Sequence, residues 1–445
     1  MTHLSSPRND PVIGSGRAAA VRHSLSRPTV KTSTVAATVF AVCLFLRCPR
    51  IFLSPRFWAE EGSLYFAQLQ HLSFGQALTF VANGNYQLAT NVIVGLSLLG
   101  RTRDAAVITT YVPFVLDILC CVLIARFMAA RSCSRVSIVV ASALFALQVT
   151  GYEVFLNATN VQWVCSAITL FLFLEPEIPA SSPGAFGRYL SVAALGLTGV
   201  TSCILLPVTI AIALALRSRI RTVMVLVLLA ASLAQLAVIL THSSNEGRSY
   251  SLSLASLIPL ALQGVFSAFL PVSSLDAIGA ALLAPDRFAS AARFQVALVG
   301  LAALDGIAAG AVESLGRFRT AILLATAIFA TAMNEFGALG DVGDFMSAYG
   351  GSRYFFLAST CVIVMLAAGL NGRSAWKRRA SAAAVMVVAV NLVLTAAAGP
   401  LPSIFFKGRS FAAQVDGCAA ATSCTVYGWP DVDWTHFEIS PNRLR

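Results

Sequence analysis

The chain has 445 residues, of which 57% are apolar and 11% are charged, and its mean hydropathy is +0.77. A soluble domain carries about 25% charged residues, so the composition excludes a soluble enzyme, a disordered protein and a nucleic-acid-binding module. The surplus of apolar side chains requires a lipid environment. The net charge of +11 fits the excess of Lys and Arg in the cytoplasmic loops of membrane proteins, so it does not indicate a polyanionic partner.

Residues 1–32 are polar, rich in Arg and Ser and poor in acids. Mitochondrial transit peptides share this composition, and so do disordered cytoplasmic tails. The abundance of Ala and Arg in the whole chain is typical of a GC-rich bacterial genome, which favours the tail. We expect a bacterial inner-membrane protein with a transmembrane domain over 33–398 and a short extracytoplasmic tail over 399–445.

Apolar runs of the length needed to cross a bilayer, about 20 residues with ~17–25 the usual range, predict an all-α polytopic membrane protein. Arg and Lys positions between the runs help to separate them. About eleven transmembrane helices result, near 33–53, 105–129, 136–150, 160–174, 188–200, 203–216, 222–241, 293–312, 320–338, 353–370 and 380–398.

The segment 74–100 decides the topology, because its apolar second half could also cross the membrane. Interpreting it as a helix in the outer interface places Arg126, Arg131 and Arg135 in the cytoplasm, as the positive-inside rule favours. The Arg-rich short loops that follow then lie inside as well. The N-terminus is therefore expected in the cytoplasm and the C-terminus outside.

The long connections 54–104 and 242–292 then lie outside, with interfacial helices expected in the first of them. Within the second, the run 252–270 could be a buried helix or part of a re-entrant hairpin. The tail holds Cys418 and Cys424, six residues apart in an oxidising compartment, where a disulfide loop is plausible and two free thiols are the alternative.

The first outer loop contains the motif RFWAEEGSLYFAQ. Two adjacent carboxylates, Glu60 and Glu61, lie between Trp58 and Tyr65, which are aromatic residues typical of a membrane interface. An acid close to lipid has a raised pKa, which suits a general base, and it could also hold a divalent cation. Capping of the following helix is the alternative role for both acids.

Two further outer segments carry polar residues at the ends of predicted transmembrane helices. The first, GYEVFLNATNVQWV, supplies amides beside an aromatic ring, a combination that suits sugar hydroxyls and C–H faces; its residues are Asn157, Asn160, Gln162 and Trp163. The second supplies Arg353 and Tyr354, and an Arg at a helix N-terminus can clamp a lipid phosphate. Pairing of Arg353 with Asp341 or Asp344 is the alternative.

Acids inside predicted transmembrane helices provide a weaker signal. Asp117 and Asp305 could serve a transporter, or they could form hydrogen bonds between helices. The chain has five His and no CxxC pair, so we expect no structural zinc site. Motifs for ATP-driven transport, serine hydrolysis and zinc proteolysis are absent from the sequence as well.

The order of these features resembles the GT-C class of membrane glycosyltransferases. The segments WAEEG, NYQLATNVIVGL, NATNVQW, LTGVTSCILLP and SRYFFL are similar to a family of bacterial multi-pass proteins described as glycosyltransferase-like. Such proteins have WAEDG in the first loop, so the resemblance implies that Glu61 is the key carboxylate, with Glu60 beside it. The longer Glu side chain leaves proton abstraction feasible and puts a strict metal geometry in doubt.

The resemblance implies transfer of a sugar from a polyprenyl-phosphate carrier to a hydroxyl of a glycan or protein acceptor on the outer face. Arg353 would hold the donor phosphate, and Tyr65, Tyr354 and the amide segment would bind substrate. No cofactor follows from it with certainty. A transporter or flippase of lipid-linked saccharides is the alternative, in which Asp117 and Asp305 would matter more, and a surface-glycan polymerase or ligase is a third.

Overall fold

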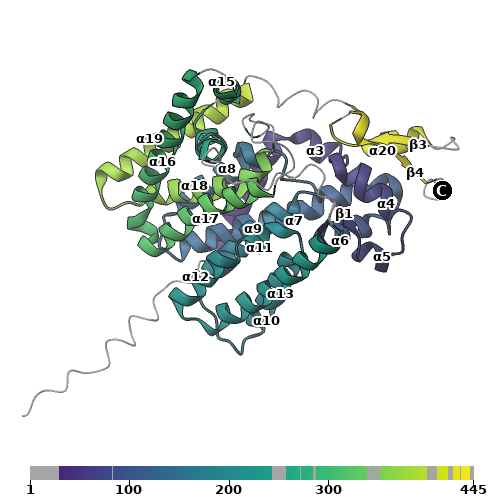
Figure 1. Ribbon diagram of the computed structural model, residues 1–445, viewed down its shortest axis with the longest axis horizontal. Helices are drawn as coiled ribbons and strands as arrows, with labels where there is room; N and C mark the ends of the chain where they lie inside the picture. Colours follow the sequence, from purple (N-terminus) through teal and green to yellow (C-terminus); the bar gives the residue numbers. More distant parts are fainter. Residues whose placement is uncertain are drawn as a thin grey trace, which may run out of the picture.

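The computed structural model describes residues 30–82, 84–242, 257–270, 272–283, 287–337, 345, 351–397, 408–418, 424–430 and 432–440. Helices dominate these residues (Figure 1). Five segments are long and apolar enough to cross a membrane: Val30–Arg47, Thr102–Ala129, Arg219–His242, Ala291–Leu315 and Ser352–Gly369. Each of them coincides with a predicted transmembrane helix. The protein is thus helical, with an architecture suited to a membrane.

The remaining predicted transmembrane helices also fall on helices of the structure, but these are shorter or less apolar. Their bounds are α8 (Arg135–Leu147), α9 (Val161–Leu174), α10 (Pro183–Gly196), α11 (Val200–Ile204), α12 (Leu206–Leu216), α17 (Arg317–Phe336) and α19 (Ala375–Ala397). The long segments contain α2 (Val30–Arg47), α7 (Ala105–Ala129), α13 (Arg219–His242), α16 (Arg287–Leu315) and α18 (Phe356–Gly369).

Two helices form the centre of the bundle. Every residue of α18 is buried, and so is every residue of α9 except Gln162. A helix that is apolar all round is stable only when other helices surround it. Accordingly, α18 packs against α16, α17 and α8, while α9 packs against α7 and α11. By contrast, α2 and α13 bury less than a quarter of their apolar windows, as expected for helices that face lipid.

The first loop folds into short elements at one end of the bundle. They are α3 (Pro49–Leu53), the π-helical η2 (Glu61–Phe66), α4 (Ala67–Leu69), α5 (Phe74–Leu78), the hairpin β1 (Val81–Ala82) and β2 (Asn85–Tyr86), α6 (Leu88–Ser97) and the 3-10 turn η3 (Thr102–Asp104). The ten residues of α6 measure about 15 Å, half of the hydrocarbon thickness. This length supports the interpretation of 74–100 as an interfacial segment.

The second long loop is described from residue 257. It contains α14 (Leu257–Pro259), η6 (Leu260–Val265), η7 (Phe266–Ala268) and α15 (Val272–Leu283). All residues of η6 are buried, against α16 and α18. The described part of 252–270 is therefore a short buried helical stretch.

Between the central helices lie two 3-10 turns, η4 (Val149–Gly151) and η9 (Ser352–Phe355). The tail forms α20 (Phe411–Gly417), β3 (Cys424–Tyr427), the turn η11 (Asp433–Thr435) and β4 (His436–Ile439), with Cys418 bonded to Cys424. Figure 1 shows this yellow module beside the purple elements of the first loop, so the tail lies next to a segment far from it in the sequence.

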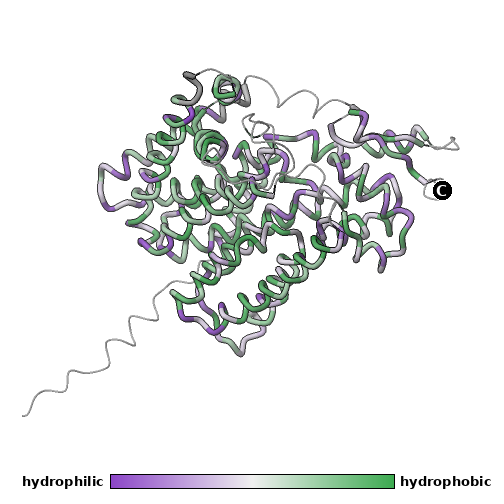
Figure 2. The backbone as a smooth tube through the Cα atoms, in the orientation of Figure 1, coloured by the Kyte–Doolittle hydropathy of each residue, from purple (hydrophilic) through white to green (hydrophobic). Residues whose placement is uncertain are grey.

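Ion pairs and hydrogen bonds connect the short loops that the predicted topology places in the cytoplasm. Arg126 at the end of α7 pairs with Glu175 at 2.7 Å, and Arg188 of α10 pairs with the same carboxylate at 2.9 Å. Arg221 of α13 donates to the Glu175 carbonyl at 2.6 Å. Figure 2 shows hydrophobic residues along the helices and hydrophilic ones at their ends, as expected for a bundle that crosses lipid.

Candidate functional site

A cavity lies where the first loop meets the N-terminal ends of α9, α11 and α18. The cavity and its open mouth together contain about 820 Å³ of space, open solvent included. All but two of the predicted site residues line it: Glu60, Tyr65, Asn160, Gln162, Trp163, Arg353 and Tyr354. These seven residues come from three segments that are far apart in the sequence, so the fold brings them together.

Arg353 is held by an acid that the sequence analysis did not single out. Its Nη1 lies 3.2 Å from Oε2 of Glu153, and its guanidinium lies 5.4 Å from the centre of the Tyr354 ring. Burial raises the pKa of Glu153, and the charge of Arg353 opposes this shift. Glu60 interacts electrostatically with both residues. An acid at the outer end of one predicted helix, opposite an outer Arg, was the available signal.

The pairing with Glu153 replaces the two acids considered from sequence. Asp341 and Asp344 lie outside the described residues. The hydrogen bond to Glu153 and the contact with the Tyr354 ring restrain the guanidinium, while further N–H groups remain for a ligand. The charge of Arg353 is thus oriented at the cavity wall.

Glu61 points away from the cavity and is 1% exposed. Its Oε2 accepts a hydrogen bond from the Trp58 amide at 2.9 Å, and its Oε1 accepts one from the Ala158 amide at 3.2 Å. Burial raises its pKa to about 8, against these hydrogen bonds and that of Thr109, which lower it. Glu61 therefore joins the first loop to the segment before α9, a structural task rather than contact with a ligand.

Glu60 is the member of the acidic pair that lines the cavity. It precedes η2, yet its side chain makes no capping hydrogen bond to that helix. It is partly exposed, so its carboxylate can meet both solvent and a ligand. The family resemblance favours Glu61, and the geometry favours Glu60 for any role in chemistry.

Three buried polar atoms on the cavity wall have no hydrogen-bond partner among the described residues: Trp163 Nε1, Asn85 Oδ1 and Thr159 Oγ1. Buried polar groups are nearly always satisfied, so these atoms are available to water or to a polar ligand in the cavity. Trp163 Nε1 can donate a hydrogen bond, Asn85 Oδ1 can accept one, and the Thr159 hydroxyl can do either. The ring of Trp163 stands edge-on to that of Tyr354 with centroids 5.1 Å apart.

The neighbouring amides are held by the backbone. Asn160 donates to the Glu153 carbonyl at 2.7 Å, and Thr201 donates to the Gln162 carbonyl at 2.7 Å. The side-chain oxygen of Gln162 lies 3.5 Å from Nδ2 of Asn85. The polar wall is therefore preorganised before any ligand binds.

Asn157, which the sequence analysis assigned to substrate binding, does not line the cavity. Its amide donates to the Glu153 carbonyl at 2.7 Å, and its oxygen accepts from the Asn160 amide at 2.8 Å. It shapes the turn that carries the lining residues. Asp117 and Asp305 also lie off the cavity: Asp117 is buried and accepts from the Leu156 amide, and Asp305 is exposed.

Within the described parts of the chain, His, Cys, Asp and Glu form no group of three that could hold a metal ion. At the cavity, the positive charge near Glu60 and Glu153 is Arg353. The comparisons with known proteins add no assignment: no family model, no curated protein and no solved structure matches this chain.

Proposed function

We propose that the protein transfers a sugar from a polyprenyl-phosphate carrier to an acceptor hydroxyl at the outer face of the membrane, as a GT-C-type glycosyltransferase. The observation that carries the proposal is the cavity itself, which combines an acid, a fixed guanidinium and unpaired polar atoms. The acid is Glu60, the guanidinium belongs to Arg353, and Trp163 is the aromatic residue among them.

In the proposed reaction Glu60 takes the proton of the acceptor hydroxyl. The acceptor oxygen forms a bond to the anomeric carbon while the bond from that carbon to the phosphate oxygen breaks. Polyprenyl phosphate leaves with the electron pair, and the configuration at the anomeric carbon inverts. General-base catalysis of this kind contributes about 10²–10⁴ in rate.

Arg353 is suited to binding the phosphate that leaves with the polyprenyl chain. Its ion pair with Glu153 fixes the guanidinium before the donor binds, and a preorganised charge stabilises the phosphate without further reorganisation. The wall near the apolar Val200, Ile204 and Met333 is suited to the first carbons of a lipid chain. Trp163, Asn85 and Thr159 supply unpaired polar atoms for the sugar.

The finer topology belongs to the same proposal. We infer that the shorter helices cross the membrane with the five long ones, that the protein lies in a bacterial inner membrane, and that the cavity opens to the outside. Every lining residue comes from the first loop or from the predicted outer end of a helix. A transporter that relies on Asp117 and Asp305 has less support, because neither acid lines the cavity.

The test compares Glu60→Gln with Glu61→Gln in purified protein reconstituted in lipid. Tritiated polyprenyl-phosphate mannose, glucose and arabinose serve as donors, and a bacterial envelope extract supplies acceptors. We expect Glu60→Gln to lower transfer by at least about 10²-fold with little change in melting temperature, because the carboxylate is partly exposed and makes no capping hydrogen bond to η2. Glu61→Gln should lower the melting temperature, because its amide nitrogen cannot accept a backbone N–H.

Asp305→Asn is the matched control, an acid replaced by its amide outside the cavity, and should leave transfer unchanged. Full transfer by Glu60→Gln would remove Glu60 from the mechanism. Absence of transfer from all three donors by the wild type, together with movement of intact lipid-linked sugar across vesicles that Asp305→Asn abolishes, would establish the transporter instead.

A further inference from the structure

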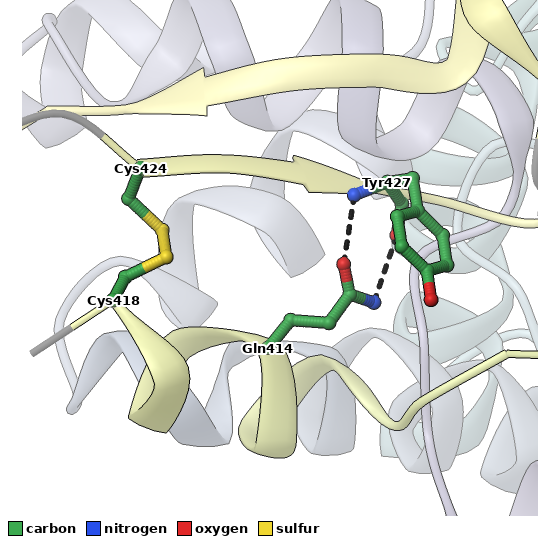
Figure 3. The surroundings of a disulfide bond; sticks show 4 residues. All are labelled: Gln414, Cys418, Cys424 and Tyr427. Carbon is green, nitrogen blue, oxygen red and sulfur yellow. Dashed lines mark hydrogen bonds between the residues drawn. A yellow bond between two sulfur atoms is a disulfide. The ribbon is translucent and has the colours of Figure 1, made fainter.

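The described tail residues form a small module with its own covalent and polar links. The disulfide Cys418–Cys424 ties the end of α20 to the start of β3 (Figure 3). Gln414 of α20 accepts from the Tyr427 amide at 2.9 Å and donates to the Tyr427 carbonyl at 3.2 Å. Helix and hairpin therefore hold each other at both ends of β3.

This module is docked on the segment that carries the acidic pair. Trp429, two residues after the end of β3, forms two backbone hydrogen bonds with the first loop: its amide donates to the Phe57 carbonyl at 2.7 Å, and its carbonyl accepts from the Ala59 amide. At the far end of the first-loop helices, Gln70 donates to the Glu438 carbonyl at 2.8 Å and accepts from the Ser440 amide at 2.9 Å. The module thus spans the whole acidic segment.

Aromatic packing fills the space between the two segments. Phe57 and Phe66 of the first loop pack against Phe411 and Phe437 of the tail, with ring centroids 4.6–6.0 Å apart. All except Phe437 are fully buried, and Phe437 is 6% exposed. The docked module is therefore part of the core of this end of the molecule.

The backbone between the anchored residues is strained. Ala59 has φ = +29°, a region that L-residues other than Gly rarely adopt. Such a conformation persists where its surroundings over-determine it. Here the Trp429 carbonyl holds the Ala59 amide from the tail, and Glu61 holds the Trp58 amide from the opposite side. The turn is what sends Glu60 to the cavity and Glu61 into the interior.

We propose that the C-terminal module positions Glu60, with Trp429 as its positioning residue. The consequence for chemistry rests on the proposed transferase function, whereas the geometric claim stands apart from it. The Trp429 ring adds a second path: it stands edge-on to Trp58 at 6.1 Å, and Trp58 stands edge-on to Tyr152 at 6.4 Å. The indole of Trp429 therefore packs against the residue whose amide Glu61 holds.

The test combines hydrogen–deuterium exchange with steady-state kinetics on the full chain in lipid. Trp429→Ala keeps the two backbone hydrogen bonds but removes the indole that packs against Trp58. The looser docking of the module should speed exchange of the amides over 57–62 by about tenfold, which corresponds to about 1.4 kcal/mol. Exchange over 159–163 should not change. The kcat for sugar transfer should fall by at least about tenfold with the donor KM within twofold, because Arg353 still binds the phosphate. Trp429→Phe should restore most of both values.

Trp434→Ala is the matched control, because Trp434 belongs to the same module and is 57% exposed; it should change neither measurement. If Trp429→Ala does not fold, the double variant Cys418→Ser/Cys424→Ser loosens the module and should give the same local exchange. Unchanged exchange over 57–62 would overturn the inference, and so would equally faster exchange over 159–163. If the wild type shows no sugar transfer but Trp429→Ala still speeds exchange over 57–62, the proposed transferase function is wrong and the positioning of this segment by the tail stands.

Discussion

Glu60 and Glu61 are adjacent acids with opposite surroundings. One lines an open cavity, and the other is buried between two backbone amides. The sequence predicts that an acid of this pair faces a ligand, but the choice between them depends on the positive φ of Ala59. That dihedral angle is imposed by the tail more than 350 residues away in the chain, so no local pattern contains it.

The buried state of Glu61 predicts a pH dependence of stability. Its pKa is about 8 in the folded protein against 4.5 for the ordinary group, so the folded state binds more protons than the unfolded state between these values. The contribution of Glu61 to stability is complete below pH 4.5 and is lost as the pH rises through 8. We expect the wild-type melting temperature to fall from pH 5 to pH 8 and then to level off.

Glu61→Gln serves as the control for this pH dependence, since an amide does not titrate. Its melting temperature should be lower at pH 5 and should vary less over the same interval, measured in detergent by intrinsic fluorescence. A melting temperature of the wild type that rises between pH 5 and pH 8, while Glu61→Gln stays flat, would show that Glu61 is ionised in the folded protein.

Most residues that line the candidate cavity could be selected from the sequence, whereas their contacts with one another could not. Arg353, Trp163 and Gln162 could be selected because charged and amide groups at the ends of apolar helices require partners. Glu153 was missed because its position near the outer end of a predicted helix indicates an outer acid but does not identify Arg353 as its partner. Asn157 was placed wrongly on the cavity wall because an amide that stabilises its own turn looks the same in sequence as one that binds a ligand.

At the scale of elements, the break between α10 and α11 shapes the cavity. Gly199 at this break has φ = +94° and ψ = 166°, and a Cβ atom there would collide with the side-chain oxygen of Gln162. Only Gly adopts this conformation readily. In the structure this break allows Thr201 to donate a hydrogen bond to the Gln162 carbonyl.

Gly199→Ala should therefore destabilise the protein by about 1–3 kcal/mol and displace Gln162 from the cavity wall. Thermal unfolding measures the first effect. The second effect is measured by the donor KM in the sugar-transfer assay, which should rise. Gly187→Ala is the control on the neighbouring α10, because nothing lies within 4 Å of a Cβ atom there. It should be neutral or stabilising. Equal stability of the two variants would contradict the role of the break.

Among the elements, hydropathy predicted the long helices well and the small ones poorly. Long apolar runs such as Thr102–Ala129 can be recognised in the sequence because their length matches the thickness of the bilayer. The four-residue strands of the tail do not, because their stability comes from docking on the first loop and from the disulfide rather than from local propensity. Only the disulfide loop itself could be anticipated.

At the scale of the whole molecule, each end of the bundle has its own set of polar contacts. Loops predicted inside bond one another: Ser134 donates to Asn371 at 2.7 Å, and Ser374 donates to Glu313 at 3.0 Å. The cavity lies among loops predicted outside. Since charge in the loops and contacts in the fold are independent observations, their agreement supports the alternation of the predicted helices across one bilayer.

This topology predicts which introduced cysteines a membrane-impermeant maleimide labels in intact cells. His71→Cys, in the first loop, should react directly, and Ser181→Cys, between α9 and α10, should react only after permeabilisation; both positions are exposed. The partly exposed thiols of Cys43 and Cys203 are first replaced by Ser. If α6 crossed the membrane, every later loop would change sides, and Ser181→Cys would react in intact cells. Labelling at that one position therefore decides whether 74–100 is interfacial, and with it the side on which Arg353 and the cavity lie.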